Sequence, residues 1–184
     1  DGFADNPPDR CYHCKTAILQ KVREAAEQVD TVYIAEGSNV DDDGDYRPGK
    51  RAVQEAGVIS PLKEAGLTKA EIRQLSKEMG LATWDKPSFA CLASRFAYEE
   101  PITAEKLRMV ELAEKFLREH GFSQYRVRMH GSMARVEVLP EDLERFLDPK
   151  LRQDFTGHMK DLGFTYTALD LDGYRTGSMN ATLK

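Results

Sequence analysis

The sequence predicts an α/β protein of two domains, residues 1–90 and 91–184. In the first domain a helical pattern leads into the short apolar run Thr31–Ala35, which is typical of a buried strand in a parallel sheet. In the second domain two alternating strands flank Gly131 and Ser132, with helical segments before and after them. We therefore expect part of a parallel-sheet α/β domain, followed by a small α+β domain with an antiparallel sheet.

The first domain begins with a turn-rich segment, residues 1–10, and continues as a helix over Cys11–Gln28. Glu36–Gly49 then leaves the carboxyl end of the predicted strand, where ligands bind in open α/β sheets. A short helix is expected near residues 50–56. Thr68–Glu71 forms a capping box that starts another helix, whose expected buried stripe consists of Ile72, Leu75 and Met79.

The second domain follows an irregular connection, residues 84–101. Thr103 caps a long helix that Gly121 closes. The remaining predicted elements are strands over Gln124–His130 and Met133–Leu139, helical segments near 141–147 and 151–162, and a last strand over Phe164–Leu171.

Composition is that of an ordinary globular protein, with 41% hydrophobic and 31% charged residues. A net charge of −5 argues against a broad nucleic-acid surface. No apolar run is long enough to cross a bilayer, so we expect no membrane partner. Three cysteines give no paired disulfide framework, which favours the cytoplasm.

Cys11 and Cys14 form a Cys-x-x-Cys motif at the predicted start of a helix, where unpaired backbone N–H groups favour thiolates. Such a pair fits a redox site, a zinc site or an iron–sulfur site. Cys91 is the remaining cysteine, and spacing alone leaves zinc and an iron–sulfur cluster equally favoured. For zinc, the candidate fourth ligands are His13, His120, His130 and His158.

Arg126, Arg128 and His130 share one face of a predicted strand, because side chains alternate along a strand. Guanidinium groups bind phosphate and carboxylate, so this face is a candidate anion site; the alternative is a solvated face paired with acidic neighbours. Ser94 and Arg95 follow Cys91 closely and suit an anionic substrate beside a thiol.

The acidic run Asp41–Asp45 resembles a calcium loop only in part. An EF-hand loop started at Asn39 would place Lys50 where the bidentate Glu belongs, which excludes that motif. Two interpretations of this acidic run remain: a solvated loop, or a segment that binds magnesium beside a nucleotide.

Five separated segments together resemble the LarE family of ATP-dependent sulfur transferases, which serve nickel-pincer nucleotide cofactor synthesis in the pyrophosphate-loop superfamily. The resemblance runs from about Asn6 to the C-terminus. The segments, in family order, are Asn6–Lys15, Gly44–Gly49, Lys86–Arg95, Arg126–Arg128 and Leu169–Asn180.

The resemblance implies a reaction and its cofactors. ATP with Mg²⁺ would adenylate a carboxylate of pyridinium-3,5-biscarboxylic acid mononucleotide, and sulfur would then displace AMP to leave a thiocarboxylate. The family type with three cysteines implies a [4Fe-4S] cluster held by Cys11, Cys14 and Cys91. Family residues that handle substrate match Ser94, Arg95, Glu114, Arg126 and Arg128, with Lys15 as a further partner for an anion.

The resemblance also implies a homo-oligomer, a hexamer, and a first domain that is the C-terminal part of an ATP-pyrophosphatase domain. The Ser-Gly-Gly-x-Asp-Ser loop of that superfamily does not occur in this sequence, so we expect it in an N-terminal portion outside it. Two other functions stay open: a cluster-dependent tRNA thiolase, and a zinc-binding module without catalysis.

Overall fold

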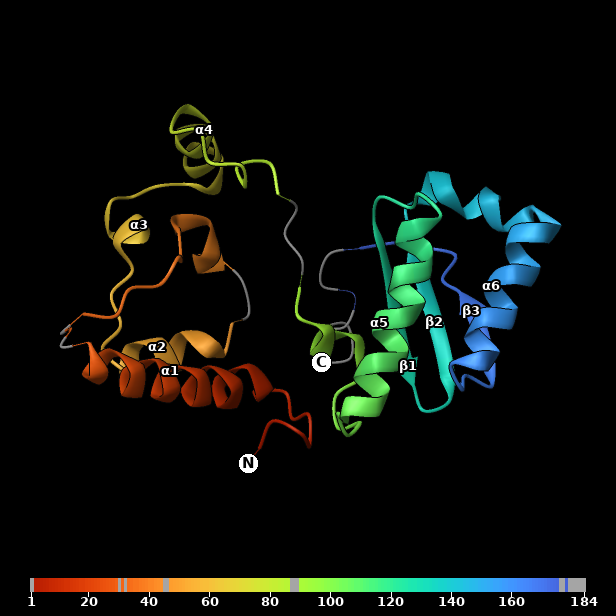
Figure 1. Ribbon diagram of the computed structural model, residues 1–184, viewed down its shortest axis with the longest axis horizontal. Helices are drawn as coiled ribbons and strands as arrows, with labels where there is room; N and C mark the ends of the chain where they lie inside the picture. Colours follow the sequence, from red (N-terminus) through yellow and green to blue (C-terminus); the bar gives the residue numbers. More distant parts are fainter. Residues whose placement is uncertain are drawn as a thin grey trace. The chain divides into compact units, whose positions relative to one another are not determined.

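The computed structural model describes residues 2–29, 31, 33–44, 47–86, 90–175 and 178, and shows an α/β chain that divides into two compact units (Figure 1). The first unit is Asp9–Phe89; the second is Ala90–Lys184 together with Gly2–Pro8. Asn6, fully buried, holds this N-terminal piece in the second unit, since its side-chain amide donates to the Ala97 carbonyl oxygen at 2.6 Å. None of the described helices is long and apolar enough to cross a membrane.

The first unit is mainly helical. Its helices are α1 (Arg10–Gln28), the 3₁₀ helix η1 (Val40–Gly44), α2 (Gly49–Glu55), α3 (Pro61–Glu64) and α4 (Lys69–Glu78). The predicted capping box starts α4, because the Thr68 and Glu71 side chains bond each other's backbone N–H groups. A small core of Leu19, Val53 and Val58 joins α1, α2 and the segment after α2.

Polar contacts add to the packing of α1 against α2. The Tyr12 hydroxyl donates to Glu55 at 2.6 Å, and the Arg51 guanidinium lies 3.7 Å from the centre of the Tyr12 ring. Gly49 is buried where the two helices meet, and a Cβ on it would lie 3.3 Å from the Cys11 carbonyl oxygen. A side chain at this position would therefore press on the backbone that carries the Cys-x-x-Cys motif.

Two predictions for the first unit are wrong. In place of a buried strand over Thr31–Ala35, Ala35 makes an isolated parallel bridge with Ile59, and Tyr33 is 76% exposed; Val32 lies outside the described residues. The expected stripe of α4 is not buried either, because Met79 is 75% exposed and no residue of that helix is buried. Ile72 is half-buried and Leu75 is 43% exposed, so the predicted stripe is covered only in part.

The second unit combines α and 3₁₀ helices with the strands of a small sheet. Its elements are η2 (Leu92–Arg95), α5 (Ala104–Glu119), β1 (Tyr125–His130), β2 (Met133–Val138), η3 (Pro140–Leu147), α6 (Pro149–Asp161) and β3 (Tyr166–Leu169). Thr103 caps α5 as predicted, and Asp148 caps α6.

The sheet has the order β1-β2-β3 and is mixed. β1 and β2 form an antiparallel hairpin in which Val127 faces Val136, whereas β3 lies parallel to β2. The prediction of an antiparallel sheet is therefore confirmed for β1 and β2 and wrong for β3. The reason is the long connection through η3 and α6, which returns the chain to the starting end of β2 and so allows a parallel pairing.

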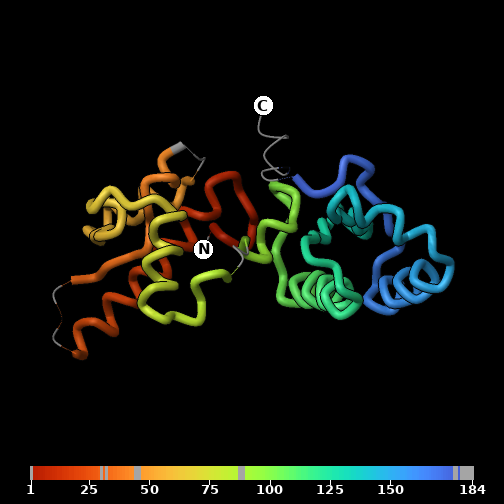
Figure 2. The backbone as a smooth tube through the Cα atoms, turned by 90° about the horizontal axis from the view of Figure 1, so that it is seen from above, coloured from red at the N-terminus to blue at the C-terminus, as the bar shows by residue number. Residues whose placement is uncertain are grey.

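One face of the sheet carries the main core of the second unit. Val127, Val136 and Val138 of the sheet pack with Leu117 of α5 and Phe155 of α6, all with at most 2% exposure. Figures 1 and 2 show α5 and α6 running along this face. The other face carries Arg126, Arg128, Arg135 and Glu137 and is called the arginine face below.

Candidate functional site

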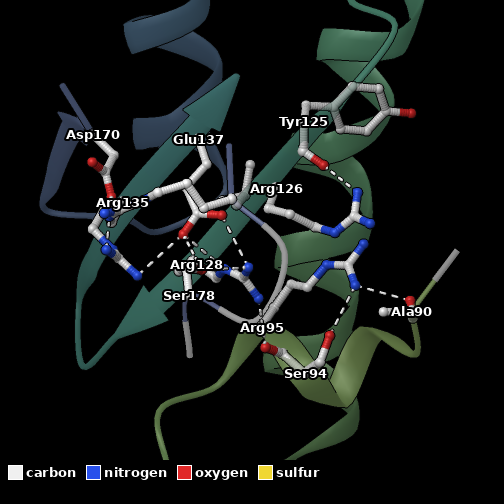
Figure 3. A network of polar contacts seen from close by, with 12 residues as sticks. Ala90, Ser94, Arg95, Tyr125, Arg126, Arg128, Arg135, Glu137, Asp170 and Ser178 are labelled. Carbon is white, nitrogen blue, oxygen red and sulfur yellow. Dashed lines mark hydrogen bonds and ion pairs between the residues drawn. The ribbon is translucent and has the colours of Figure 1, made fainter. Parts of the chain in front are cut away.

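Cys91 is held by its backbone at the start of η2, and its side chain is exposed. Its carbonyl oxygen accepts hydrogen bonds from the Ser94 backbone N–H at 2.9 Å, the Ser94 hydroxyl at 2.7 Å and Arg95 Nη1 at 3.1 Å. Arg95 Nη1 also donates to the Ala90 carbonyl oxygen at 2.9 Å (Figure 3). Ser94 and Arg95 thus fix the main chain that presents the Cys91 thiol.

Arg95 is itself fixed by Glu114 of α5. Its Nε and Nη2 donate to the two Glu114 oxygens at 2.7 and 2.9 Å, and both side chains are buried. The same Glu114 carboxylate accepts from the Val127 backbone N–H at 3.1 Å, which supplies a partner for an edge strand. This bidentate ion pair neutralises the charge of Arg95 inside the protein.

Arg128 is neutralised in the same way by Glu137, which is fully buried. Arg128 Nε and Nη2 donate to the Glu137 oxygens at 3.1 and 2.9 Å, and Nη1 donates to the Ser94 carbonyl oxygen at 2.9 Å. Glu137 also accepts from Arg135 at 3.2 Å and from the Ser178 hydroxyl at 2.9 Å. The alternation of β2 puts Glu137 on the same face as Arg135, but Glu137 is not among the site residues predicted from the sequence.

Arg126 differs from these neighbours. It is 3% exposed, yet none of the described carboxylates forms an ion pair with it. Its Nη1 donates to the Tyr125 carbonyl oxygen at 2.5 Å, and Figure 3 shows its guanidinium group beside that of Arg95. Burial, and then the positive charge of Arg95, lower the pKa of Arg126 from its ordinary value.

The positive charge of Arg126 is therefore not balanced by any described carboxylate of the arginine face. A buried cation without a counter-charge is costly, and an incoming carboxylate or phosphate would relieve that cost. The structure places Arg95, Glu114, Arg126 and Arg128 together in the second unit, and the three arginines have different partners. The anion site stays a prediction.

Cys11, in the first unit, lines a cavity of about 300 Å³. The predicted anion partner Lys15 lines the same cavity, with Nζ 3.9 Å from the Glu36 carboxylate. Although burial favours its neutral form, hydrogen bonds from Ser38 and Ser60 hold the pKa of Glu36 below its ordinary value. The other lining residues are Arg47, Pro48, Gly49, Lys50 and Val53, so three basic residues line this cavity together with Cys11.

Cys11 and Cys14 lie one helical turn apart on α1, Cys11 exposed and Cys14 half-buried. Cys91 belongs to the second unit. Among the residues that the structure describes, no group of three His, Cys, Asp or Glu side chains is arranged to hold a metal ion. The three-cysteine cluster stays a prediction, and only its two ligands on α1 are side by side within one unit.

Comparison with known proteins places the chain in a family. No family model matches it. It is 41% identical over 181 residues to an uncharacterized protein of Synechocystis, covering 98% of the chain and 68% of that protein. It is 38% identical over 187 residues to the pyridinium-3,5-bisthiocarboxylic acid mononucleotide synthase of Lactiplantibacillus plantarum, covering 100% of the chain and 66% of the synthase.

An uncharacterized protein of Methanocaldococcus jannaschii is 30% identical over 176 residues, which are 96% of the chain and 68% of that protein. The chain thus spans about two thirds of the length of these relatives. It belongs, with them, to the family of the pyridinium-3,5-bisthiocarboxylic acid mononucleotide synthase, the LarE family.

Proposed function

We propose that this chain is part of an ATP-dependent sulfur transferase that converts pyridinium-3,5-biscarboxylic acid mononucleotide to its thiocarboxylate. The name of the Lactiplantibacillus plantarum relative, a pyridinium-3,5-bisthiocarboxylic acid mononucleotide synthase, supports this function. The structural observation that carries it is the arrangement around Arg95. Its guanidinium group fixes the main chain of the exposed Cys91 and lies beside that of the buried Arg126, which has no described counter-charge. A substrate with two carboxylates and one phosphate matches such a site in charge.

The described residues have distinct roles in this proposal. Arg126 binds a carboxylate or phosphate of the substrate. Ser94, Arg95 and Glu114 hold the Cys91 backbone, and Arg128 joins η2 to the sheet through the Ser94 carbonyl oxygen. Lys15, beside Cys11, is proposed to attract an anionic group in the first unit.

Carboxylate activation explains the need for ATP. A free carboxylate is a poor acyl donor, whereas an acyl-adenylate carries AMP as a leaving group. We propose that ATP with Mg²⁺ forms the acyl-adenylate and releases pyrophosphate, and that a sulfur nucleophile then replaces AMP. The first unit is proposed to be the C-terminal part of the pyrophosphate-loop domain that binds ATP.

We propose that the three cysteines hold a [4Fe-4S] cluster, which would supply the sulfur. The ligand type fits, because iron–sulfur clusters take cysteine thiolates and the chain has three cysteines. Cys11, Cys14 and Cys91 would hold it, and an iron without a protein ligand would carry the sulfide. A homo-oligomer, a hexamer by family resemblance, completes the proposal and is measurable by light scattering.

Iron and sulfide analysis of the full-length enzyme, purified without oxygen, tests this function. We expect brown protein with iron and acid-labile sulfide, and loss of both in Cys11→Ser, Cys14→Ser and Cys91→Ser. The control is His13→Gln, between the two cysteines of α1, which should keep its colour. Colourless protein with one zinc per chain, lost in His13→Gln, would instead support a zinc-binding module.

Turnover of the pyridinium substrate with ATP separates the enzyme hypotheses. Thiocarboxylate formation that depends on Arg126, measured with Arg126→Gln, is the expected result. Tight binding of tRNA that weakens steeply with salt, without thiocarboxylate formation, would support the tRNA thiolase instead.

A further inference from the structure

Asp170–Arg175 and Ser178, here called the strap, run beside β2 in the second unit. The Asp170 backbone N–H donates to the Val136 carbonyl oxygen at 2.8 Å, and the Tyr174 backbone N–H donates to that of Val138 at 2.7 Å. Gly173 makes this path possible: its φ is +68°, and a Cβ there would lie 2.9 Å from the Val138 carbonyl oxygen. The strap is therefore fitted closely to the sheet.

Ser178 ties the strap to the arginine face. Its hydroxyl donates to Glu137 at 2.9 Å and accepts from Arg128 Nη2 at 2.9 Å (Figure 3). One hydroxyl thus uses both its donor and its acceptor capacity on two buried, charged groups. Asp170 adds an ion pair with Arg135 at 2.8 Å.

Tyr174 lies over Arg126. The centre of its ring is 5.0 Å from the Arg126 guanidinium carbon, within the range of a cation–π contact. Arg126 is the arginine of this face that lacks a carboxylate partner among the described residues. The strap therefore places an aromatic ring beside the cation that an anionic ligand would neutralise.

We propose that Tyr174 is a further ligand-contacting residue of the anion site at Arg126, and that Ser178 is the positioning residue that holds it there. The inference rests on the proposed function, because the expected anion is the carboxylate or phosphate of a pyridinium mononucleotide. The ring keeps water from the guanidinium group, and attraction between Arg126 and an anion is stronger in a less polar environment. The strap therefore adds affinity and slows the departure of the ligand.

Calorimetric titration of the full-length enzyme with nicotinic acid mononucleotide tests the inference. This probe carries one carboxylate and one phosphate on a pyridinium nucleotide; nicotinic acid and inorganic phosphate, titrated separately, tell which group binds. We expect Ser178→Ala to weaken binding about tenfold, the effect of one hydrogen bond to charged groups. Ser178→Thr, which keeps the hydroxyl, should restore most of the affinity.

Matched variants separate positioning from folding. Ser123→Ala removes an exposed hydroxyl on the loop before β1 and should bind like the wild type. Tyr174→Leu should also weaken binding about tenfold, whereas Tyr174→Phe keeps the ring and most of the affinity. Stopped-flow measurements should show faster dissociation in Ser178→Ala with an unchanged association rate.

The outcomes distinguish the two proposals. Equal or tighter binding in Ser178→Ala and Tyr174→Leu would overturn the role of the strap and leave the proposed function standing. If the wild type binds none of the three probes, the substrate assignment itself fails. Should Ser178→Ala fail to fold, Tyr174→Leu decides the question, because the Tyr174 side chain is only half-buried.

Discussion

At the scale of single residues, Arg95 of η2 and the three arginines of the arginine face differ in their partners. Arg95 and Arg128 each donate two hydrogen bonds to a buried glutamate. Arg135 forms ion pairs with Glu137 and Asp170, and Arg126 forms none with a described carboxylate. Alternation along a strand predicts that Arg126 and Arg128 lie on one face. It does not predict the partner of Arg95, since Glu114 comes from the helix α5 and is brought there by the tertiary fold.

Removal of one partner from a buried pair should be far more damaging than removal of a surface partner. Glu114→Ala would leave Arg95 charged, buried and unpaired, so we expect a loss of about 3–5 kcal/mol in the free energy of unfolding. Urea titration measures it. Glu111→Ala, which breaks an exposed pair with Arg108 on the same helix, should change stability by less than about 1 kcal/mol. Similar losses in both would contradict this assignment.

His130 should make the second unit less stable in acid. Burial, and then the charge of Arg135, lower the pKa of His130 below its ordinary value, and Nε2 is buried without a hydrogen-bond partner in the described part of the chain. The unfolded chain therefore binds a proton more readily than the folded one. Stability from this group is fully present above the unfolded pKa and is lost as pH falls through the folded pKa.

Comparison with His130→Gln isolates this contribution. The nearby charged groups Glu100, Arg128, Arg135 and Glu137 are common to both proteins. The difference in unfolding free energy, wild type minus variant, should fall as pH decreases from about 7 to about 5. A difference that is constant with pH would show that His130 does not titrate on unfolding.

At the scale of secondary-structure elements, the sequence predicted helix caps correctly, but it did not predict correctly which apolar segments are buried. The capping box at Thr68 and the cap at Thr103 form as predicted, because both depend on residues three positions apart. The predicted strand over Thr31–Ala35 and the stripe of α4 failed, because an apolar pattern predicts a preference for burial but cannot supply the covering surface. The parallel placement of β3 depends on how α6 packs, which strand patterns do not contain.

Two glycines of the second unit should respond in opposite ways to alanine. Gly157 lies inside α6, and a Cβ there meets nothing within 4 Å, so Gly157→Ala should stabilise the protein by about 0.5–1 kcal/mol. Gly173→Ala should destabilise it, because the new Cβ would meet the Val138 carbonyl oxygen at 2.9 Å in a left-handed backbone conformation. Thermal unfolding of both variants checks this. The reverse order would mean that Gly157 has a role in packing.

At the scale of the whole molecule, the two units differ in how much core each one has. The first has three buried hydrophobic residues in its described core, Leu19, Val53 and Val58. The second has an extended core in which two helices pack on a sheet. Sequence composition predicted a globular chain with two patterns of elements, but it could not predict this difference in burial, which decides relative stability.

Unfolding of this chain should therefore begin in the first unit. Trp84 is the single tryptophan and belongs to that unit, so its fluorescence reports on the first unit alone. We expect the fluorescence transition in urea at a lower concentration than the main loss of secondary structure measured by circular dichroism. Coincident transitions would show that the two units unfold cooperatively.

The hydrogen bonds at Cys91 have a consequence for the durability of the site. All three donors bind the carbonyl oxygen of this residue, and none of them depends on its side chain. The sulfur can therefore be exchanged, alkylated or lost while the peptide around it keeps its place. Because the local geometry does not depend on the side chain, a protein repaired at this position would recover a working site without refolding.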